Sequence, residues 1–173
     1  IVESIDTAYV GEQGVQEIVD KAPEILRKVR YVEEKRIVQE FLYEIGHDTG
    51  LATYGEEEVK RSLKMGAVKT LLLSEDLERV RVTIKCTNCD YQKQETMRSQ
   101  ALMAYEQNSV GKACPKCKTP NLTLAETKEI IDDLAELAEE AGADVEVISG
   151  QTEEGQMLKK SFGGIAAVLR FKH

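Results

Sequence analysis

Residues 67–73, Ala-Val-Lys-Thr-Leu-Leu-Leu, form an apolar run with the length of one strand. Such a run predicts a strand that is buried on both faces, as in a sheet that carries helices on each side. The preceding residues 56–65 begin with three glutamates and are followed by Gly66. Acidic residues suit the first turn of a helix and glycine commonly ends one. The stretch therefore predicts a short helix that leads into a central strand of an α/β domain.

Helix and strand patterns alternate on both sides of this stretch. Apolar residues recur at helical spacing over 32–45, followed by Gly46, and again over 130–141. Pro23 predicts the start of a separate short helix, after a helical stretch that ends near Lys21. Further strands are predicted over 5–9, 51–54, 79–85, 145–148 and 165–171, and a further helix is predicted after Thr152. This alternation predicts an α/β fold with a mainly parallel or mixed sheet, covered on both faces.

The four cysteines of the chain form two CxxC pairs, Cys86 with Cys89 and Cys114 with Cys117. Two such pairs can supply four thiolate sulfurs to one tetrahedral Zn²⁺, so a structural zinc site is predicted. Four protein ligands leave the metal no open position, so we expect no metal catalysis. The alternatives are a redox dithiol and four unligated thiols. A redox pair should open a helix after a strand, and neither pair has that setting.

The segment around the cysteines differs in charge from the rest of the chain. Eight basic and three acidic residues lie between 79 and 118, a formal charge of +5 within a chain of net charge −8. Only this segment has a field suited to a polyanion. An RNA contact through Lys112, Lys116 and Lys118 is one hypothesis, and a solvated surface is the simpler interpretation. The acidic run of residues 56–58 is likewise interpreted as a solvated helix face.

Length and composition place the chain among single globular domains. It has 173 residues, 42% of them hydrophobic, and no apolar run long enough to span a membrane. No signal peptide is evident, and paired cysteines fit a reducing compartment, so a cytoplasmic location is expected. The chain begins at Ile1 without a methionine, so we expect either an excised fragment or a longer protein of which this sequence is only a part.

No catalytic constellation emerges from the residues. Asp48-Thr49-Gly50 is similar to an aspartic-protease triplet but lacks the apolar context before it. The two histidines, His47 and His173, lie in a predicted loop and at the end of the chain. Neither has an evident orienting partner, so neither is expected to act as a general base. We therefore expect that this chain is not an enzyme.

Four stretches, taken together and in order, resemble the C-terminal domain of the archaeal and eukaryotic class-1 peptide chain release factor. They are Ser4–Tyr9 with Gly11-Glu12-Gln13-Gly14, Asp48–Gly55, Leu63–Leu72 and Ser161–Arg170. The resemblance covers essentially the whole chain, and the cysteine insert is similar to the archaeal version, which carries a zinc-binding minidomain. It implies an α/β/α sandwich with a mixed central sheet over 1–173, interrupted by a small zinc-ribbon-like minidomain over 81–123.

The resemblance also implies a function without catalysis in this part of the factor. The stop-codon motif Asn-Ile-Lys-Ser and the catalytic Gly-Gly-Gln loop of the family do not occur in this sequence. What the family assigns to this domain is docking to a translational GTPase and to the ribosome-recycling ATP-binding-cassette ATPase. On the ribosome, the full-length factor can then terminate protein synthesis at stop codons. No membrane partner is expected.

The GTPase surface of the family matches residues 32–55 here. The candidate partner-binding residues are Val38, Phe41, Leu42, Ile45 and Tyr54. A helical apolar stripe is more often core than interface. If Ile37, Phe41 and Ile45 face the core, Val38 and Leu42 on the flank are the better candidates for exposed anchors.

Two alternatives stay open at this point. The first is the C-terminal domain of the related no-go-decay and ribosome-rescue factor, which shares the fold and a similar final strand. The cysteine insert and Phe162-Gly163-Gly164 favour the release factor instead. The second is an independent zinc-ribbon module that binds RNA through the basic segment.

Overall fold

The computed structural model of the chain describes residues 12–172, and the side chains of residues 22–172 except 24, 25 and 28. The strand predicted over 5–9 lies outside the described residues. The helices are α1 (Glu12–Gly46), α2 (Glu56–Lys64), α3 (Leu102–Ser109), α4 (Ile130–Glu140) and α5 (Glu153–Phe162), with a short 3₁₀ turn at Ser99–Ala101. The strands are β1 (Ala52–Tyr54), β2 (Val68–Ser74), β3 (Arg79–Cys86), β4 (Gln92–Arg98), β5 (Leu122–Glu129), β6 (Asp144–Ile148) and β7 (Ile165–Leu169).

The first sheet contains four strands in the order β1-β7-β2-β6. Strands β2 and β6 are parallel, whereas β7 is antiparallel to both β1 and β2, so the sheet is mixed. The predicted central strand is confirmed: Leu71, Leu72 and Leu73 on β2 are fully buried. The neighbouring strand β7, residues 165–169, is buried along its whole length. Both strands are buried because helices cover both faces of the sheet.

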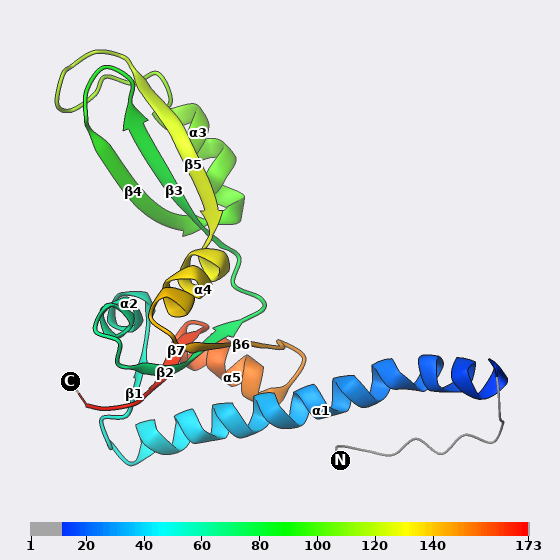
Figure 1. Ribbon diagram of the computed structural model, residues 1–173. Coiled ribbons are helices and arrows are strands. Elements are labelled where there is room, and N and C mark those ends of the chain that lie inside the picture. Colours follow the sequence, from blue (N-terminus) through cyan, green and yellow to red (C-terminus); the bar gives the residue numbers. More distant parts are fainter. Residues whose placement is uncertain (1–11, 173) are drawn as a thin grey trace.

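Two apolar cores lie on opposite faces of this sheet (Figure 1). On one face, Leu71 and Leu73 pack with side chains of α2 and α4, including Leu63 and Leu134. On the other face, Leu72 packs with side chains of α1 and α5. The alternation of β2 side chains between the two cores follows from the pleat of a strand, in which successive side chains point to opposite faces. The predicted mixed α/β fold is confirmed.

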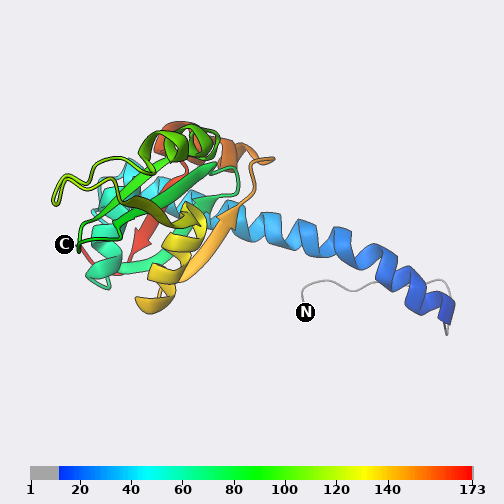
Figure 2. The same ribbon diagram turned by 90° about the horizontal axis from the view of Figure 1, so that it is seen from above.

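Helix α1 differs from the prediction. It is a single helix from Glu12 to Gly46, and Pro23 lies inside it, so the separate short helix predicted from Pro23 is wrong. A proline inside a helix removes one backbone hydrogen bond and disfavours the helix, but it does not have to stop it. The first half of α1 extends well beyond the α/β body in both views (Figures 1 and 2). No helix among the described residues has the length and apolar content needed to cross a membrane.

A second sheet lies above the α/β body in the view of Figure 1, with α4 between it and the first sheet. It contains three antiparallel strands in the order β4-β3-β5. Its apolar core is separate and is formed by Val80, Val82, Ile84 and Leu122 with Cys86 and Cys114, packed against α3 side chains such as Leu102 and Tyr105. The alternation predicted for 79–85 is present on β3 except at Thr83, which is buried. Elements β4, α3 and β5 were not predicted. The two sheets together match the fold class only in part, because the second sheet forms a larger unit than the two cysteine pairs alone suggest.

Candidate functional site

The four cysteines converge at the end of the second sheet. Cys86 ends β3, Cys89 follows in the next turn, and Cys114 and Cys117 lie in the loop between α3 and β5. Their sulfur atoms all lie within 4.8 Å of one another. The Sγ–Sγ distance is 3.6 Å from Cys86 to Cys117 and 3.7 Å from Cys89 to Cys114. A tetrahedral Zn²⁺ with bonds of about 2.3 Å would separate its sulfur ligands by about 3.8 Å, so the donor set fits zinc in number, chemistry and spacing.

Backbone hydrogen bonds hold both cysteine pairs in tight turns. In the second pair, Lys118 N–H donates to the Cys114 carbonyl over 2.9 Å, and Cys114 N–H donates to Thr119 over 2.8 Å. In the first pair, Asn88 N–H points to the Cys86 sulfur at 3.4 Å. Lys118 has a φ angle of +63°, in the left-handed region that favours glycine. The chain thus adopts a glycine-like turn at a position occupied by lysine.

The pKa values of Cys89 and Cys117 are shifted in opposite directions. The Thr119 hydroxyl, followed by the Thr119 backbone, hydrogen-bonds to Cys117 and lowers the pKa of this thiol to about 6. A hydrogen bond from the Tyr91 backbone lowers the pKa of Cys89, but burial and the neighbouring thiols outweigh it and raise that pKa to about 12. Zinc binds the thiolate form. Of these two sulfurs, Cys117 therefore becomes available as a thiolate at lower pH than Cys89.

The three lysines named in the RNA hypothesis are all exposed beside the second cysteine pair. Lys112, Lys116 and Lys118 lie on the loop that carries Cys114 and Cys117. Lys116 pairs with Asp90 of the other turn, which raises the pKa of the lysine and lowers the pKa of the aspartate. The pair is more than half exposed on both sides, so it contributes little to stability.

The candidate partner surface at the end of α1 needs one correction. Val38 and Phe41 are both fully buried in the core between α1 and the sheet. Val38 was expected on an exposed flank, and that expectation is wrong. The reason is that α5 packs beside α1, so the apolar stripe buried on α1 is wide enough to include Ile37, Val38 and Phe41 together.

The other three candidates remain accessible. Leu42 and Ile45 are partly buried at the edge of the same core, and Tyr54 on β1 is 50% exposed. The Tyr54 ring meets Phe162 edge-on with 5.2 Å between ring centroids, and Phe162 meets Phe41 at 4.9 Å. Sequence analysis missed Phe162 as a support for this surface, because it comes from α5, which is more than 100 residues away in the sequence.

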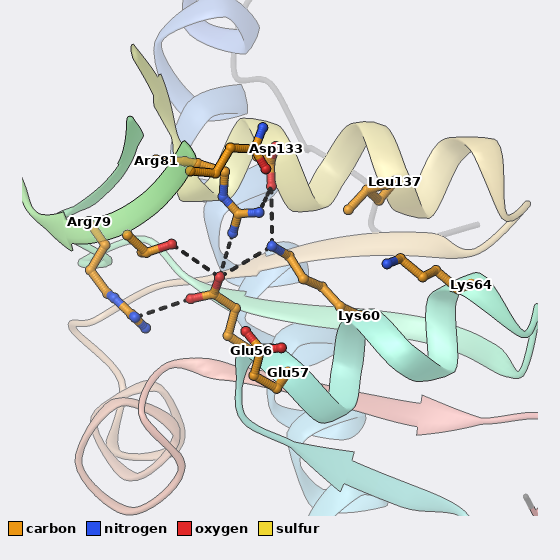
Figure 3. A pocket seen from close by; sticks show the side chains of 10 residues that line it. Glu56, Glu57, Lys60, Lys64, Arg79, Arg81, Asp133 and Leu137 are labelled. Carbon is orange, nitrogen blue, oxygen red and sulfur yellow. Dashed lines mark hydrogen bonds and ion pairs between the residues drawn. The ribbon is translucent and has the colours of Figure 1, made fainter. Parts of the chain in front are cut away.

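A cavity of about 640 Å³ lies between the α/β body and the second sheet (Figure 3). It is lined by Glu56, Glu57, Lys60, Lys64, Arg79, Arg81, Gln94, Thr96, Asp133 and Leu137. The side chain of Glu56 is only 11% exposed and pairs with Lys60, Arg79 and Arg81. The interpretation of residues 56–58 as a solvated helix face is therefore wrong for Glu56. Glu56 and Lys60 are four residues apart on one helix, but the tertiary structure alone brings Arg79, Arg81 and Asp133 to them, so local sequence could not reveal the whole cluster.

Comparison with known proteins places these features in one family. The family described as eRF1 domain 3 matches residues 31–173. Peptide chain release factor subunit 1 from Pyrococcus abyssi is 47% identical over 172 residues, which are 99% of this chain and 41% of that protein. The chain therefore spans less than half the length of the curated relatives it matches.

Solved structures agree with the sequence comparison. The C-terminal domain of peptide chain release factor from Methanosarcina mazei is 37% identical, with a TM-score of 0.80 over 95% of this chain and 98% of that one. A model of ribosome-bound archaeal Pelota and ABCE1 matches 96% of this chain and 34% of that chain at 22% identity, with a TM-score of 0.54. At that identity, the likeness to Pelota shows a shared fold alone.

Proposed function

This chain belongs to the peptide chain release factor family, as its C-terminal domain, and from that premise we propose that it is the partner-binding domain of a translation termination factor. The proposed partner is a translational GTPase, which docks on the surface formed by the end of α1 and by β1. Residues Leu42, Ile45 and Tyr54 are the proposed contacts. The domain itself is proposed to be noncatalytic, with peptide release carried out elsewhere in the full-length factor.

The observation that carries this proposal is the exposed aromatic surface around Tyr54. A half-exposed tyrosine supported from below by Phe162 is a rigid, amphipathic anchor of the kind enriched at binding hot spots. Tyr43, near the end of α1, is 58% exposed and lies against His47, with ring centroids 4.1 Å apart. These exposed rings lie on the segment that matches the GTPase surface of the family.

The ribosome-recycling ATPase is a second proposed partner. For archaeal Pelota, a model of the ribosome-bound protein with ABCE1 is known. The part that this chain shares with Pelota is the fold. We propose that this fold presents a comparable platform for an ATP-binding-cassette ATPase and that the full-length factor uses it on the ribosome.

Isothermal titration calorimetry with the cognate GTPase tests the first proposal. Leu42→Asp and Tyr54→Asp should each abolish or strongly weaken binding. Met103→Asp is the matched control, because Met103 is 73% exposed on α3, in the second sheet unit, and its change adds the same charge. Circular dichroism establishes that each variant is folded. Unchanged affinity in both surface variants would remove this surface from the interface.

The cysteine cluster is proposed to hold one structural Zn²⁺ in a unit over 81–123. The donor set carries this proposal, because four sulfurs at tetrahedral spacing are the common ligand set for structural zinc. Native mass spectrometry of the purified chain should detect one zinc per molecule. Cys114→Ser should abolish the bound metal, whereas the exposed Ser99→Ala should not.

The three exposed lysines on the loop that carries Cys114 and Cys117 support a secondary proposal, a contact with RNA. Lys112, Lys116 and Lys118 crowd one loop within a segment of formal charge +5. If they contact ribosomal RNA, filter binding at low salt should show affinity that falls with rising salt and with neutralisation of the three lysines. Absence of RNA affinity at low salt would reject this role and leave the protein-binding proposal intact.

A further inference from the structure

The second sheet and the α/β body have separate apolar cores. The core of the second sheet is built from β3, β5 and α3 side chains, and none of its members belongs to the two cores of the body. The chain crosses between the units at residues 75–78 and again where β5 passes directly into α4. The two units are joined by two chain connections and share no apolar core. Other contacts must therefore set the angle between them.

A group of charged side chains lines the cavity at the junction (Figure 3). Arg81 on β3 reaches across to the body, where it pairs with Glu56 on α2 and with Asp133 on α4, the latter over 3.1 Å from Nη1 to Oδ2. Lys60 on α2 lies between the same two carboxylates, 3.3 Å from Glu56 and 3.8 Å from Asp133. Arg79 adds a second arginine from β3, 3.1 Å from Glu56. One guanidinium thus joins the second sheet to two different helices of the body.

The central members of this group are largely removed from solvent. The exposed fractions of the Glu56, Arg81, Lys60 and Asp133 side chains lie between 11% and 20%. Pairs this buried are screened by salt much less than surface pairs are. Lys128 and Glu136 also pair across the junction, but Glu136 is 63% exposed, so that pair is expected to contribute little.

Burial makes this group suited to fixing geometry more than to adding stability. Removing charges from water costs about as much free energy as their pairing returns, so buried ion pairs are often close to neutral for net stability. Arg81 Nε and Asp133 Oδ2 are both buried without a hydrogen-bond partner, so the Arg81–Asp133 contact is an ion pair without a hydrogen bond, which lowers the gain further. Tilting the second sheet would separate Arg81 from both carboxylates at once and leave buried charges unpaired. The network therefore penalises any other angle between the units.

We propose that Arg81, Glu56 and Asp133 form an electrostatic latch that holds the second sheet at one fixed angle on the α/β body. The loops that carry the two cysteine pairs lie at the end of the second sheet farthest from the body (Figure 1). A small tilt at the junction therefore becomes a large displacement of the cysteine loops and their lysines. The latch sets where that basic tip stands relative to the aromatic surface of the body, and it does so whatever partner either surface binds.

Residual dipolar couplings of backbone amides test the latch in the zinc-supplemented 173-residue chain. If the units form one rigid body, amides of β2 and β7 and amides of β3 and β5 share one alignment tensor. The parent chain should behave in this way. Arg81→Met keeps the length of the side chain but removes its charge, and it should give the second sheet a smaller alignment magnitude than the first. The melting temperature should fall, because this variant leaves the buried carboxylates of Glu56 and Asp133 with fewer partners, so the tensors are compared at a temperature where circular dichroism shows the variant folded.

Two further variants make the result decisive. Glu56→Gln keeps the side-chain shape and should also separate the two tensors. Arg61→Met is the control, because Arg61 lies on α2, as Glu56 does, but forms an exposed pair with Glu58. In this variant the two sheets should still share one tensor. One shared tensor in both Arg81→Met and Glu56→Gln would overturn the latch. Loss of dispersed amide signals in both variants would also overturn it, because the network would then be needed for folding rather than for orientation.

Discussion

Glu34 on α1 accepts a hydrogen bond of 2.9 Å from the backbone N–H of Ser149, 115 residues further along the chain. The carboxylate is only 2% exposed and also pairs with Arg30 at 2.8 Å. Ser149 begins the loop between β6 and α5, so this contact ties α1 to the end of the first sheet. A single buried side chain therefore joins the long helix to the loop that follows β6, more than 100 residues further along the chain.

Replacing Glu34 should destabilise the domain. Glu34→Ala leaves the Ser149 N–H without an acceptor in a buried place, so the free energy of unfolding should fall by about 2 kcal/mol. Glu34→Gln retains an acceptor oxygen and should cost less. The neighbouring Glu33 is exposed, so Glu33→Ala is the control. Urea denaturation measures all three, and equal stability of Glu34→Ala and Glu33→Ala would contradict the assignment.

Gly155 on α5 should not tolerate alanine. Alanine is favoured over glycine inside a helix by about 1 kcal/mol, so propensity alone predicts stabilisation. A Cβ at this position would stand 1.9 Å from the backbone oxygen of Ser149, which cannot move without displacing the loop. We expect the clash to dominate, with a net loss of about 2 kcal/mol in the free energy of unfolding. Thermal denaturation with the exposed Gln156→Ala as control decides the sign, since a higher melting temperature for Gly155→Ala would refute the clash.

Lys118→Gly should strengthen the second cysteine turn. A lysine at φ +63° carries a steric cost of about 1 kcal/mol that glycine does not. Its relief should raise zinc affinity roughly fivefold, because metal binding and ordering of the turn are linked. Competition with a chromophoric chelator measures the change. Lys116→Gly is the control, since Lys116 has no positive φ, and an equal gain there would show that conformation is not the cause.

Glu146 on β6 should make stability depend on pH. Burial, followed by the charges of Glu33 and Glu34, raises the pKa of its carboxyl group. At a pH between the ordinary glutamate pKa and this raised pKa, the folded state holds a proton that the unfolded state has already lost. Stability is therefore higher at acidic pH and falls as the pH rises from the ordinary glutamate value through the raised folded pKa.

Glu146→Gln should remove this dependence. The variant should gain a few tenths of a kcal/mol at pH 7, a small value because the side chain is only partly buried. The gain should vanish below the ordinary glutamate pKa. Urea denaturation at pH 7 and at acidic pH measures it, with the exposed Glu153→Gln as control. A gain that is the same at both pH values would point to a cause other than ionisation.

Removal of the proposed zinc should unfold the second sheet and spare the first. Cys86 and Cys114 belong to the core of the second sheet, so loss of the metal removes both its cross-link and part of its packing. The two cores of the α/β body share no residue with it. After chelation, hydrogen exchange should accelerate in β3 and β5 and remain slow in β2 and β7. A single cooperative loss of protection in both sheets would show that the units do not fold independently.

Local sequence patterns were sufficient for the elements whose environment is uniform. The apolar run at 67–73 predicted β2 because a strand buried on both faces needs apolar residues at nearly every position. The spacing of the cysteines predicted their convergence, because a CxxC pair brings its own two sulfurs together and a tetrahedral ion needs two such pairs. The family could be predicted from four short stretches in order.

Features that depend on packing between distant segments could not be predicted in this way. Pro23 was predicted to start a separate short helix, yet α1 continues through it. Val38 was expected to be exposed, but α5 packs beside α1 and buries it. Glu56 has the sequence context of a solvated residue, and only its ion pairs with Arg79 and Arg81 of β3 turn it into the centre of a buried charge network. Local sequence thus determined the strands and helices of the first sheet unit and the convergence of the four cysteines, because those depend on near neighbours. Tertiary structure alone decided which faces are covered and which charges meet, because solvent exposure and ion pairing depend on groups that the chain brings together only on folding.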